Sequence, residues 1–243
     1  MMLPPTFDAR LVRARALTPS VRELVFERVD GAPMAFEAGQ WVSTTIGEAK
    51  RSYSIASGPD GSPRFEVTVT LVPNGPASTR LHSMAEGEAL SFMGPQGFFT
   101  RTGEAALAPA LYIATGTGVT PMRSFLQAAV RRGDKVPTWL VLGVRREQDL
   151  LYEDELRALA REHAWFRFEP SLSQGSDAWP GRRGYVQTHV RALWDELANQ
   201  VVFGGRAPHA YICGLERMVG SVRDLLRKEM ALPRQQVHSE RYD

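Results

Sequence analysis

Up to about residue 100, short runs of alternating apolar and polar residues are separated by turn residues. A period of two is typical of strands that bury one face. Segments rich in glycine and proline, such as residues 57–63 and 73–76, supply the turns that an antiparallel barrel or sandwich requires. The expected strands are residues 9–17, 21–28, 41–46, 51–55, 65–72 and 89–93.

Beyond residue 100 the pattern changes to apolar strands that alternate with amphipathic helices. This alternation predicts right-handed crossovers and a parallel sheet with helices on both faces. The expected strands are residues 110–115, 138–144, 165–170 and 209–213, and the expected helices are residues 119–133, 149–163, 186–200 and 215–230. We therefore expect two domains, an antiparallel β-barrel in residues 1–102 and an α/β domain with a parallel sheet in residues 103–243.

The charge balance argues against a nucleic-acid partner. The chain has 29 basic and 27 acidic residues, and residues 1–101 hold ten of each sign, so neither part is a basic block. No apolar run approaches the roughly 20 residues that span a bilayer, and the first residues lack the layout of a signal peptide. We therefore expect no membrane segment and a cytoplasmic location.

Cys213 is the only cysteine of the 243 residues, which excludes an internal disulfide and a cluster held by several cysteines of this chain. The five histidines show no pairing at metal-ligand spacing. The sequence therefore predicts no metal site.

Two segments carry more polar groups than a structural element needs. In residues 51–57 (RSYSIAS), Tyr53 and Ile55 share a face, but four of the seven side chains bear a hydroxyl. In residues 115–121 (TGTGVTP), glycines stand between an apolar strand and a helix, where backbone N–H groups can approach a pyrophosphate. Pro121 replaces the third glycine of G-x-G-x-x-G, so a purely structural turn is the alternative.

Four other segments are ambiguous by themselves. Residues 75–80 suit either an anion-binding turn with a short helix or a simple β-turn. Residues 94–98 indicate a turn that leads out of the barrel. Cys213 and Gly214 follow an apolar strand, at the edge where parallel sheets bind ligands, although such a cysteine can equally be a small buried hydrophobe. The terminal residues 238–243 give no clear signal.

Together and in this order, the segments resemble the ferredoxin–NADP reductase family of flavoproteins across essentially the whole chain. The R-x-Y-S strand of that family matches Arg51, Tyr53 and Ser54, and its G-x-x-S turn matches Gly75 and Ser78. The remaining matches are G-P-x-G-F at residues 94–98, GTGVTP at 116–121, C-G at 213–214 and E-x-Y at 240–242.

The resemblance implies bound FAD in the first domain. Arg51 would pair with the flavin pyrophosphate, Tyr53 would pack against the isoalloxazine ring, and Ser54 would place a hydroxyl near the flavin N5. The expected FAD contacts are Arg51, Ser52, Tyr53, Ser54, Gly75, Ser78 and Thr79.

The resemblance also implies a nicotinamide dinucleotide, NADPH or NADH, in the second domain. Its pyrophosphate would lie at the glycine turn, and Cys213 and Glu240 would control the approach of its ring, while Tyr242 would act as a movable cover over the flavin. The expected contacts are Thr115, Gly116, Thr117, Gly118, Thr120, Pro121, Arg145, Ser173, Cys213, Gly214 and Tyr242, and the expected catalytic residues are Ser54, Cys213, Glu240 and Tyr242.

Two departures from the family pattern leave points open. Members that prefer NADPH often follow the serine equivalent to Ser173 with arginine, but this chain has Gln174, so the extra charge would come from Arg145 and Arg146 or from Arg182 and Arg183. Some members also end on the tyrosine, whereas this chain adds Asp243.

The implied function is electron transfer between NAD(P)H and a separate carrier protein, ferredoxin or flavodoxin, through bound FAD. We expect a monomer. The alternatives are an NAD(P)H-dependent reductase of free flavin and an electron-transfer subunit of a larger complex.

Overall fold

The computed structural model describes residues 4–200 and 205–242, so Asp243 lies outside the described residues. Contacts divide the chain into two compact units. The first unit comprises Met1–Thr100 with Thr120–Gly133, and the second comprises Arg101–Val119 with Asp134–Asp243. A boundary between residues 102 and 103 remains a prediction.

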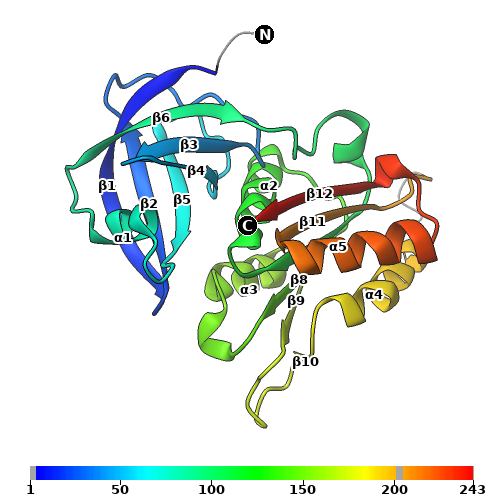
Figure 1. Ribbon diagram of the computed structural model, residues 1–243. Coiled ribbons are helices and arrows are strands. Elements are labelled where there is room, and N and C mark those ends of the chain that lie inside the picture. Colours follow the sequence, from blue (N-terminus) through cyan, green and yellow to red (C-terminus); the bar gives the residue numbers. More distant parts are fainter. Residues whose placement is uncertain (1–3, 201–204, 243) are drawn as a thin grey trace. The chain divides into compact units, whose positions relative to one another are not determined.

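The first unit is built on a six-stranded antiparallel sheet (Figure 1). Its strands lie in the order β4-β3-β6-β1-β2-β5. The first half of β1 alternates exposed and buried residues as the sequence pattern predicts. The elements are β1 (Thr6–Thr18), β2 (Val21–Arg28), β3 (Trp41–Ile46), β4 (Ala49–Ser54), β5 (Arg64–Thr70), α1 (Pro76–Ser83), β6 (Ala89–Gln96) and α2 (Val119–Arg132).

An antiparallel bridge between Ile55 and Val67 joins the end of β4 to β5, the strand at the other edge of the sheet. This bridge brings the two edges together, as barrel closure requires. Inside lies a cluster of aromatic rings with centroids 4.9 to 6.1 Å apart, formed by Phe7, Phe26, Phe65 and Phe92. The expectation of a turn at residues 94–98 was wrong in part, because β6 continues through Gly94 and Pro95 to Gln96.

The second unit is built on a six-stranded sheet in the order β10-β9-β8-β7-β11-β12, in which every pair of neighbours is parallel. Its strands are β7 (Ala110–Thr115), β8 (Thr138–Val144), β9 (Phe166–Leu172), β10 (Arg182–Arg183), β11 (His209–Leu215) and β12 (Val237–Tyr242). Its longer helices are α3 (Glu153–Glu162), α4 (Gln187–Gln200) and α5 (Glu216–Asp224). The predicted fold class, an antiparallel barrel followed by an α/β parallel sheet, is confirmed.

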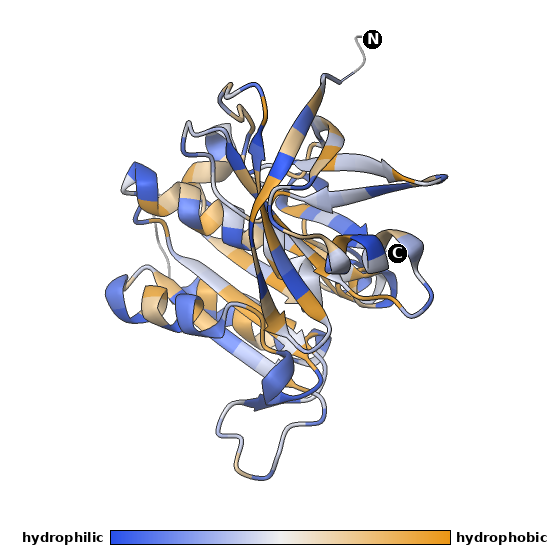
Figure 2. Ribbon diagram, turned by 90° about the vertical axis from the view of Figure 1, so that its left-hand side faces the viewer, coloured by the Kyte–Doolittle hydropathy of each residue, from blue (hydrophilic) through white to orange (hydrophobic). Residues whose placement is uncertain are grey.

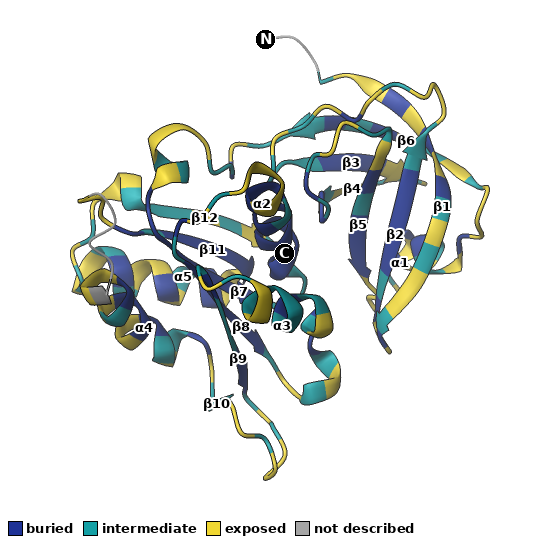
Figure 3. Cartoon of the chain, turned by 180° about the vertical axis from the view of Figure 1, so that it is seen from behind, coloured by how far each residue is buried: buried dark blue, intermediate teal, exposed yellow. Residues whose placement is uncertain are grey.

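The central strands β7, β8 and β11 are buried along nearly their whole length (Figure 3). On one face of the sheet, Ile113 and Ile212 pack against the apolar sides of α4 and α5. The helices of the structure carry hydrophilic as well as hydrophobic residues (Figure 2), as helices with one solvent-facing side do. Of the ambiguous C-terminal segment, residues 238–242 belong to β12, which adds to the sheet beside β11.

Among the described residues, no helix combines the length and the apolar character that crossing a membrane needs. In the same part of the chain, no group of three or more His, Cys, Asp or Glu side chains is arranged to hold a metal ion.

Candidate functional site

Strand β4 presents the residues expected to bind flavin. Its pairing with β3 places Arg51 opposite Thr44 and Ser54 opposite Trp41. Arg51 is exposed, and its Nη1 donates a hydrogen bond to the carbonyl of the neighbouring Lys50 at 2.9 Å. The guanidinium therefore lies at the surface, where its other donors can meet an anion.

Farther along the strand, the side chains become more buried. Tyr53 is half-buried against the barrel core, and this burial raises the pKa of its hydroxyl, while the nearby Arg51 charge acts in the opposite direction. Ser54 is only 6% exposed. A ring edge and a hydroxyl at the end of a strand suit a flat, partly apolar ligand with polar edges, so β4 fits a flavin.

The turn before α1 is closed by the Ser78 hydroxyl. This oxygen accepts a hydrogen bond from Val72 N at 3.1 Å and donates to Gly75 O at 3.0 Å. A Cβ on Gly75 would lie 2.8 Å from the same oxygen, so a larger residue would disturb the turn. Because the hydroxyl shapes the turn, the groups that α1 can offer to a pyrophosphate are the backbone N–H groups of its first turn, which lack partners within the helix. Thr79 N already donates to Gly75 O at 2.9 Å.

The glycine turn of the second unit is packed tightly on one side and open on the other. A Cβ on Gly118 would lie 2.2 Å from the carbonyl oxygen of Cys213, so the turn touches the backbone of β11. Gly214 adopts φ +141°, and a Cβ there would lie 2.2 Å from Thr115 Oγ1. The same Oγ1 accepts a hydrogen bond from Leu215 N at 3.3 Å. Gly116 adopts φ +52° and has open space where a Cβ would be. Open space beside a strand-to-helix turn fits the approach of a pyrophosphate.

Cys213, Glu240 and Tyr242 lie together on one face of the sheet. The parallel register of β11 and β12 pairs Cys213 with Glu240 and Leu215 with Tyr242. The Cys213 side chain is fully buried. This burial and the Glu240 carboxylate raise the pKa of the thiol well above its usual range. A hydrogen bond with the Tyr242 side chain partly opposes the rise. Cys213 is therefore a neutral thiol near pH 7, which suits contact with a ligand better than nucleophilic attack.

At the carboxyl ends of β8 and β9, backbone hydrogen bonds hold two predicted residues side by side. Ser173 N donates to Val144 O at 3.1 Å, and Gln174 N donates to Arg145 O at 2.8 Å. The Arg145 side chain is exposed. Of the three other candidate arginines, Arg146 is also exposed, whereas Arg182 and Arg183 are engaged elsewhere. Arg182 pairs with Glu169 at 2.7 Å. Arg183 donates to the carbonyls of Gly175, Ser176, Asp177 and Trp179 at 2.7 to 3.3 Å.

Arg123 and Glu66 were not among the residues expected from the sequence. The Arg123 side chain is 7% exposed and forms an ion pair with Glu66. A charged residue on the apolar side of a predicted helix indicates, in the sequence, that a partner of opposite charge is needed. The partner itself, 57 positions earlier, could not be identified without the fold.

Comparison with known proteins finds two family domains, and the second includes residues 120–133, which the contacts place in the first unit. Residues 8–100 match the family model described as an oxidoreductase FAD-binding domain, and residues 112–224 match an oxidoreductase NAD-binding domain. The chain is 52% identical to ferredoxin–NADP reductase B of Sorangium cellulosum, and the alignment covers 100% of both chains. It is 31% identical to the reductase component of a phenol 2-monooxygenase from Pseudomonas sp. strain CF600, over 84% of this chain and 56% of that one.

Solved structures agree with the fold. A ferredoxin–NADP+ reductase from Neisseria gonorrhoeae, solved with FAD and NADP, matches with a TM-score of 0.78 and 22% identity over 97% of this chain and 98% of that one. A ferredoxin–NADP+ reductase from Plasmodium falciparum matches with a TM-score of 0.82 and 22% identity over 100% of both chains.

The fold and the two matched domains define an oxidoreductase that binds FAD and a nicotinamide dinucleotide. With a relative 52% identical over its full length, the chain belongs to the ferredoxin–NADP reductase family.

Proposed function

We propose that this protein transfers electrons between NAD(P)H and a separate one-electron carrier protein, with FAD as its resident cofactor. The observation that carries the proposal is the register of β11 and β12, which gathers Cys213, Glu240 and Tyr242 on one face. A neutral buried thiol beside a carboxylate and a phenol can orient a nicotinamide ring without reacting with it. Bound FAD supplies the hydride acceptor and can release electrons one at a time.

On the flavin side, Arg51 pairs with the pyrophosphate and Tyr53 contacts the ring system. The hydroxyl of Ser54 donates a hydrogen bond to the reacting edge of the ring. Ser52, Gly75, Ser78 and Thr79 complete the flavin contacts, with Ser78 acting through the turn that it closes. The exposure of Arg51 and the half-burial of Tyr53 support the first two roles.

On the nucleotide side, the N–H groups of residues 115–118 and the start of α2, with Thr120 and Pro121, hold the pyrophosphate. Gly116 leaves room for it, and Gly118 and Gly214 allow the turn to lie against β11. Cys213 and Glu240 set how closely the ring approaches, and Tyr242 covers the flavin until the nucleotide enters.

For the coenzyme we propose NADPH. Its extra 2′-phosphate needs a cation. Arg182 and Arg183 already bind Glu169 and loop carbonyls, which leaves the exposed Arg145 and Arg146. Of these two we propose Arg145, whose carbonyl accepts a hydrogen bond from the residue after Ser173. Replacement of Arg145 by alanine would then raise the KM for NADPH by about tenfold or more and leave the KM for NADH within about twofold. Equal effects on both coenzymes would remove this role.

For the acceptor we propose a ferredoxin, with flavodoxin as a second substrate. This chain has a single cysteine, and an iron–sulfur cluster needs several, so electrons pass to another protein. Its 52% identical relative is named as a reductase of ferredoxin. We further propose that the protein is a cytoplasmic monomer, which light scattering of the purified protein would check.

The deciding experiment is steady-state kinetics with NADPH and NADH in parallel, with a ferredoxin, a flavodoxin and free flavin as alternative acceptors. We expect FAD to remain bound through gel filtration and the ferredoxin to be reduced fastest. A protein that loses its flavin on the column and reduces free flavin best would instead be a flavin reductase.

A second candidate function is that of a reductase component for an oxygenase. It is favoured by the 31% identity to the phenol 2-monooxygenase reductase component, of which this chain spans 56%. Electron delivery to an oxygenase without any added carrier would establish this function, and a strict requirement for ferredoxin or flavodoxin would exclude it.

A further inference from the structure

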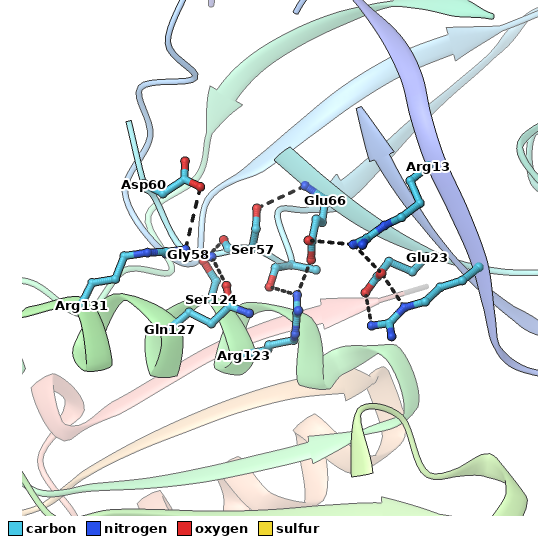
Figure 4. Close-up of polar contacts among 12 residues, drawn as sticks. Arg13, Glu23, Ser57, Gly58, Asp60, Glu66, Arg123, Ser124, Gln127 and Arg131 are labelled. Atoms are coloured by element: carbon cyan, nitrogen blue, oxygen red, sulfur yellow. Dashed lines mark hydrogen bonds and ion pairs between the residues drawn. The ribbon is translucent and has the colours of Figure 1, made fainter. Parts of the chain in front are cut away.

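One side of α2 carries four polar side chains that contact residues 56–60 (Figure 4). Residues 56 and 57 are the last two of the RSYSIAS segment, so the contacted backbone leads directly out of the strand expected to hold flavin. The contacts run in order along the helix. They join Arg123 Nη1 to Ala56 O at 3.0 Å, Ser124 Oγ to Ser57 O at 2.7 Å, Gln127 Oε1 to Gly58 N at 2.8 Å, and Arg131 to Pro59 O at 3.4 Å and to the Asp60 carboxylate at 3.9 Å.

We call this set of contacts the α2 ladder. Gly58 lies at its centre, where a Cβ would come within 2.8 Å of Gln127 Cβ and 2.9 Å of Ala128 N. The backbone of residues 56–60 therefore touches the helix itself, and only glycine allows this approach. Gly39 is a second glycine that lies against α2, because a Cβ there would be 2.5 Å from the ring of Phe125.

Arg123 extends the ladder into the sheet. It forms an ion pair with Glu66 of β5, which lies 3.9 Å from Arg13 of β1. Arg13 in turn lies 3.8 Å from Glu23 of β2, whose side chain is fully buried. The Arg123–Glu66 pair resists displacement, because moving Arg123 would leave it largely buried without this carboxylate. Glu23 is held mainly by Arg15, at 2.7 Å, so the Arg13 contacts add only a weaker link to β1 and β2. The start of α2 is therefore fixed chiefly to β5.

The same compact unit thus contains the flavin residues of β4 and the start of α2, where Thr120 and Pro121 are expected to meet the pyrophosphate of the nicotinamide nucleotide. Arg123 and Ser124 lie within about one helical turn of those two residues. We propose that the α2 ladder is a positioning device, which holds the pyrophosphate-binding end of α2 at a fixed distance from the flavin strand and so sets the geometry of hydride transfer. This inference rests on the proposed function.

A positioning role and a merely structural role differ in what they change. A structural contact affects the melting temperature, but not the rate constant of flavin reduction at saturating NADPH. A positioning contact affects that rate constant even where the nucleotide still binds, because a misplacement of about 1 Å costs up to about 100-fold in rate.

The test compares Gly58→Ala, which forces residues 56–60 away from α2, with Gly220→Ala, the same change at a helical position with nothing within 4 Å. Ser124→Ala, which removes one contact without adding bulk, is the milder second variant. The measurements are FAD content after gel filtration, hydrogen exchange of residues 56–60, the NADP+ dissociation constant, and stopped-flow reduction of the flavin by NADPH.

We expect the Gly58→Ala protein to keep its FAD and to exchange the amide hydrogens of residues 56–60 faster than wild type. Its NADP+ dissociation constant should stay within about threefold of wild type, whereas its rate constant of flavin reduction should fall at least about tenfold. Ser124→Ala should lower the rate about threefold, and Gly220→Ala should match wild type. Rates within about twofold of wild type in both ladder variants would overturn the inference, and if Gly58→Ala does not fold, Ser124→Ala decides alone. Wild-type protein that binds no FAD, or is not reduced by NADPH, would instead overturn the proposed function.

Discussion

Replacement of Gly118 by alanine tests the contact between the glycine turn and β11. A Cβ at this position would lie 2.2 Å from Cys213 O, 2.5 Å from Cys213 C and 2.7 Å from Gly214 Cα. All three are backbone atoms, so no side chain can rotate away. Ordinary contact begins near 3.4 Å, and the turn must therefore withdraw from β11 by about 1 Å.

The cost follows from this overlap. Forcing an extra carbon into a packed site costs about 1 to 3 kcal/mol, which for a chain of this size lowers the melting temperature by about 2 to 12 °C. The displaced turn also loses alignment with the pyrophosphate. Loss of one charge-assisted hydrogen bond, worth about 1.5 to 3 kcal/mol, weakens nucleotide binding by about 10- to 150-fold.

The assay combines thermal unfolding followed by circular dichroism with titration of the flavin spectrum by NADP+. FAD content should stay at the wild-type level, because the expected flavin residues belong to the other compact unit. Gly220→Ala supplies the control for adding a methyl group without a clash. A Gly118→Ala protein with wild-type melting temperature and wild-type NADP+ affinity would refute the reasoning.

Three further predictions concern single side chains. Arg51→Ala should raise the FAD dissociation constant by about 10- to 150-fold, measured by flavin fluorescence, and unchanged retention would remove its pyrophosphate role. Cys213→Ala should keep FAD but slow its reduction in stopped flow, and a wild-type rate would exclude Cys213 from ring positioning. His238 lies 3.0 Å from His209, and burial and this neighbour lower its pKa to about 4. As the pH is lowered, the unfolded chain, with a histidine pKa near 6.5, binds this proton at a higher pH than the folded protein does. The free energy of unfolding should therefore decrease as the pH falls from about 6.5 to about 4. His238→Gln should flatten this pH dependence, and an unchanged slope would contradict the assignment.

Much of the fold could be predicted from the sequence because it rests on local pattern. The period-two runs gave β2 and β3 with their observed bounds, and the apolar runs gave β7 and β8. The exceptions depended on distant partners. Residues 94–96 contain glycine and proline, which favour a turn, yet β6 continues through them, and the terminal residues became a strand only because β11 offered an open edge.

The sequence by itself determined the chemistry that was available: hydroxyls and an arginine in one strand, glycines at one strand-to-helix turn, and a single cysteine before Gly214. The tertiary structure decided which of these groups meet. Strand register placed Glu240 beside Cys213, and the backbone contacts of Arg183 removed it from the arginines open to a ligand. Only the fold could identify Glu66 and Ala56 as the partners of Arg123. Ion pairs and hydrogen bonds depend on distance in space, which cannot be read from separation along the chain.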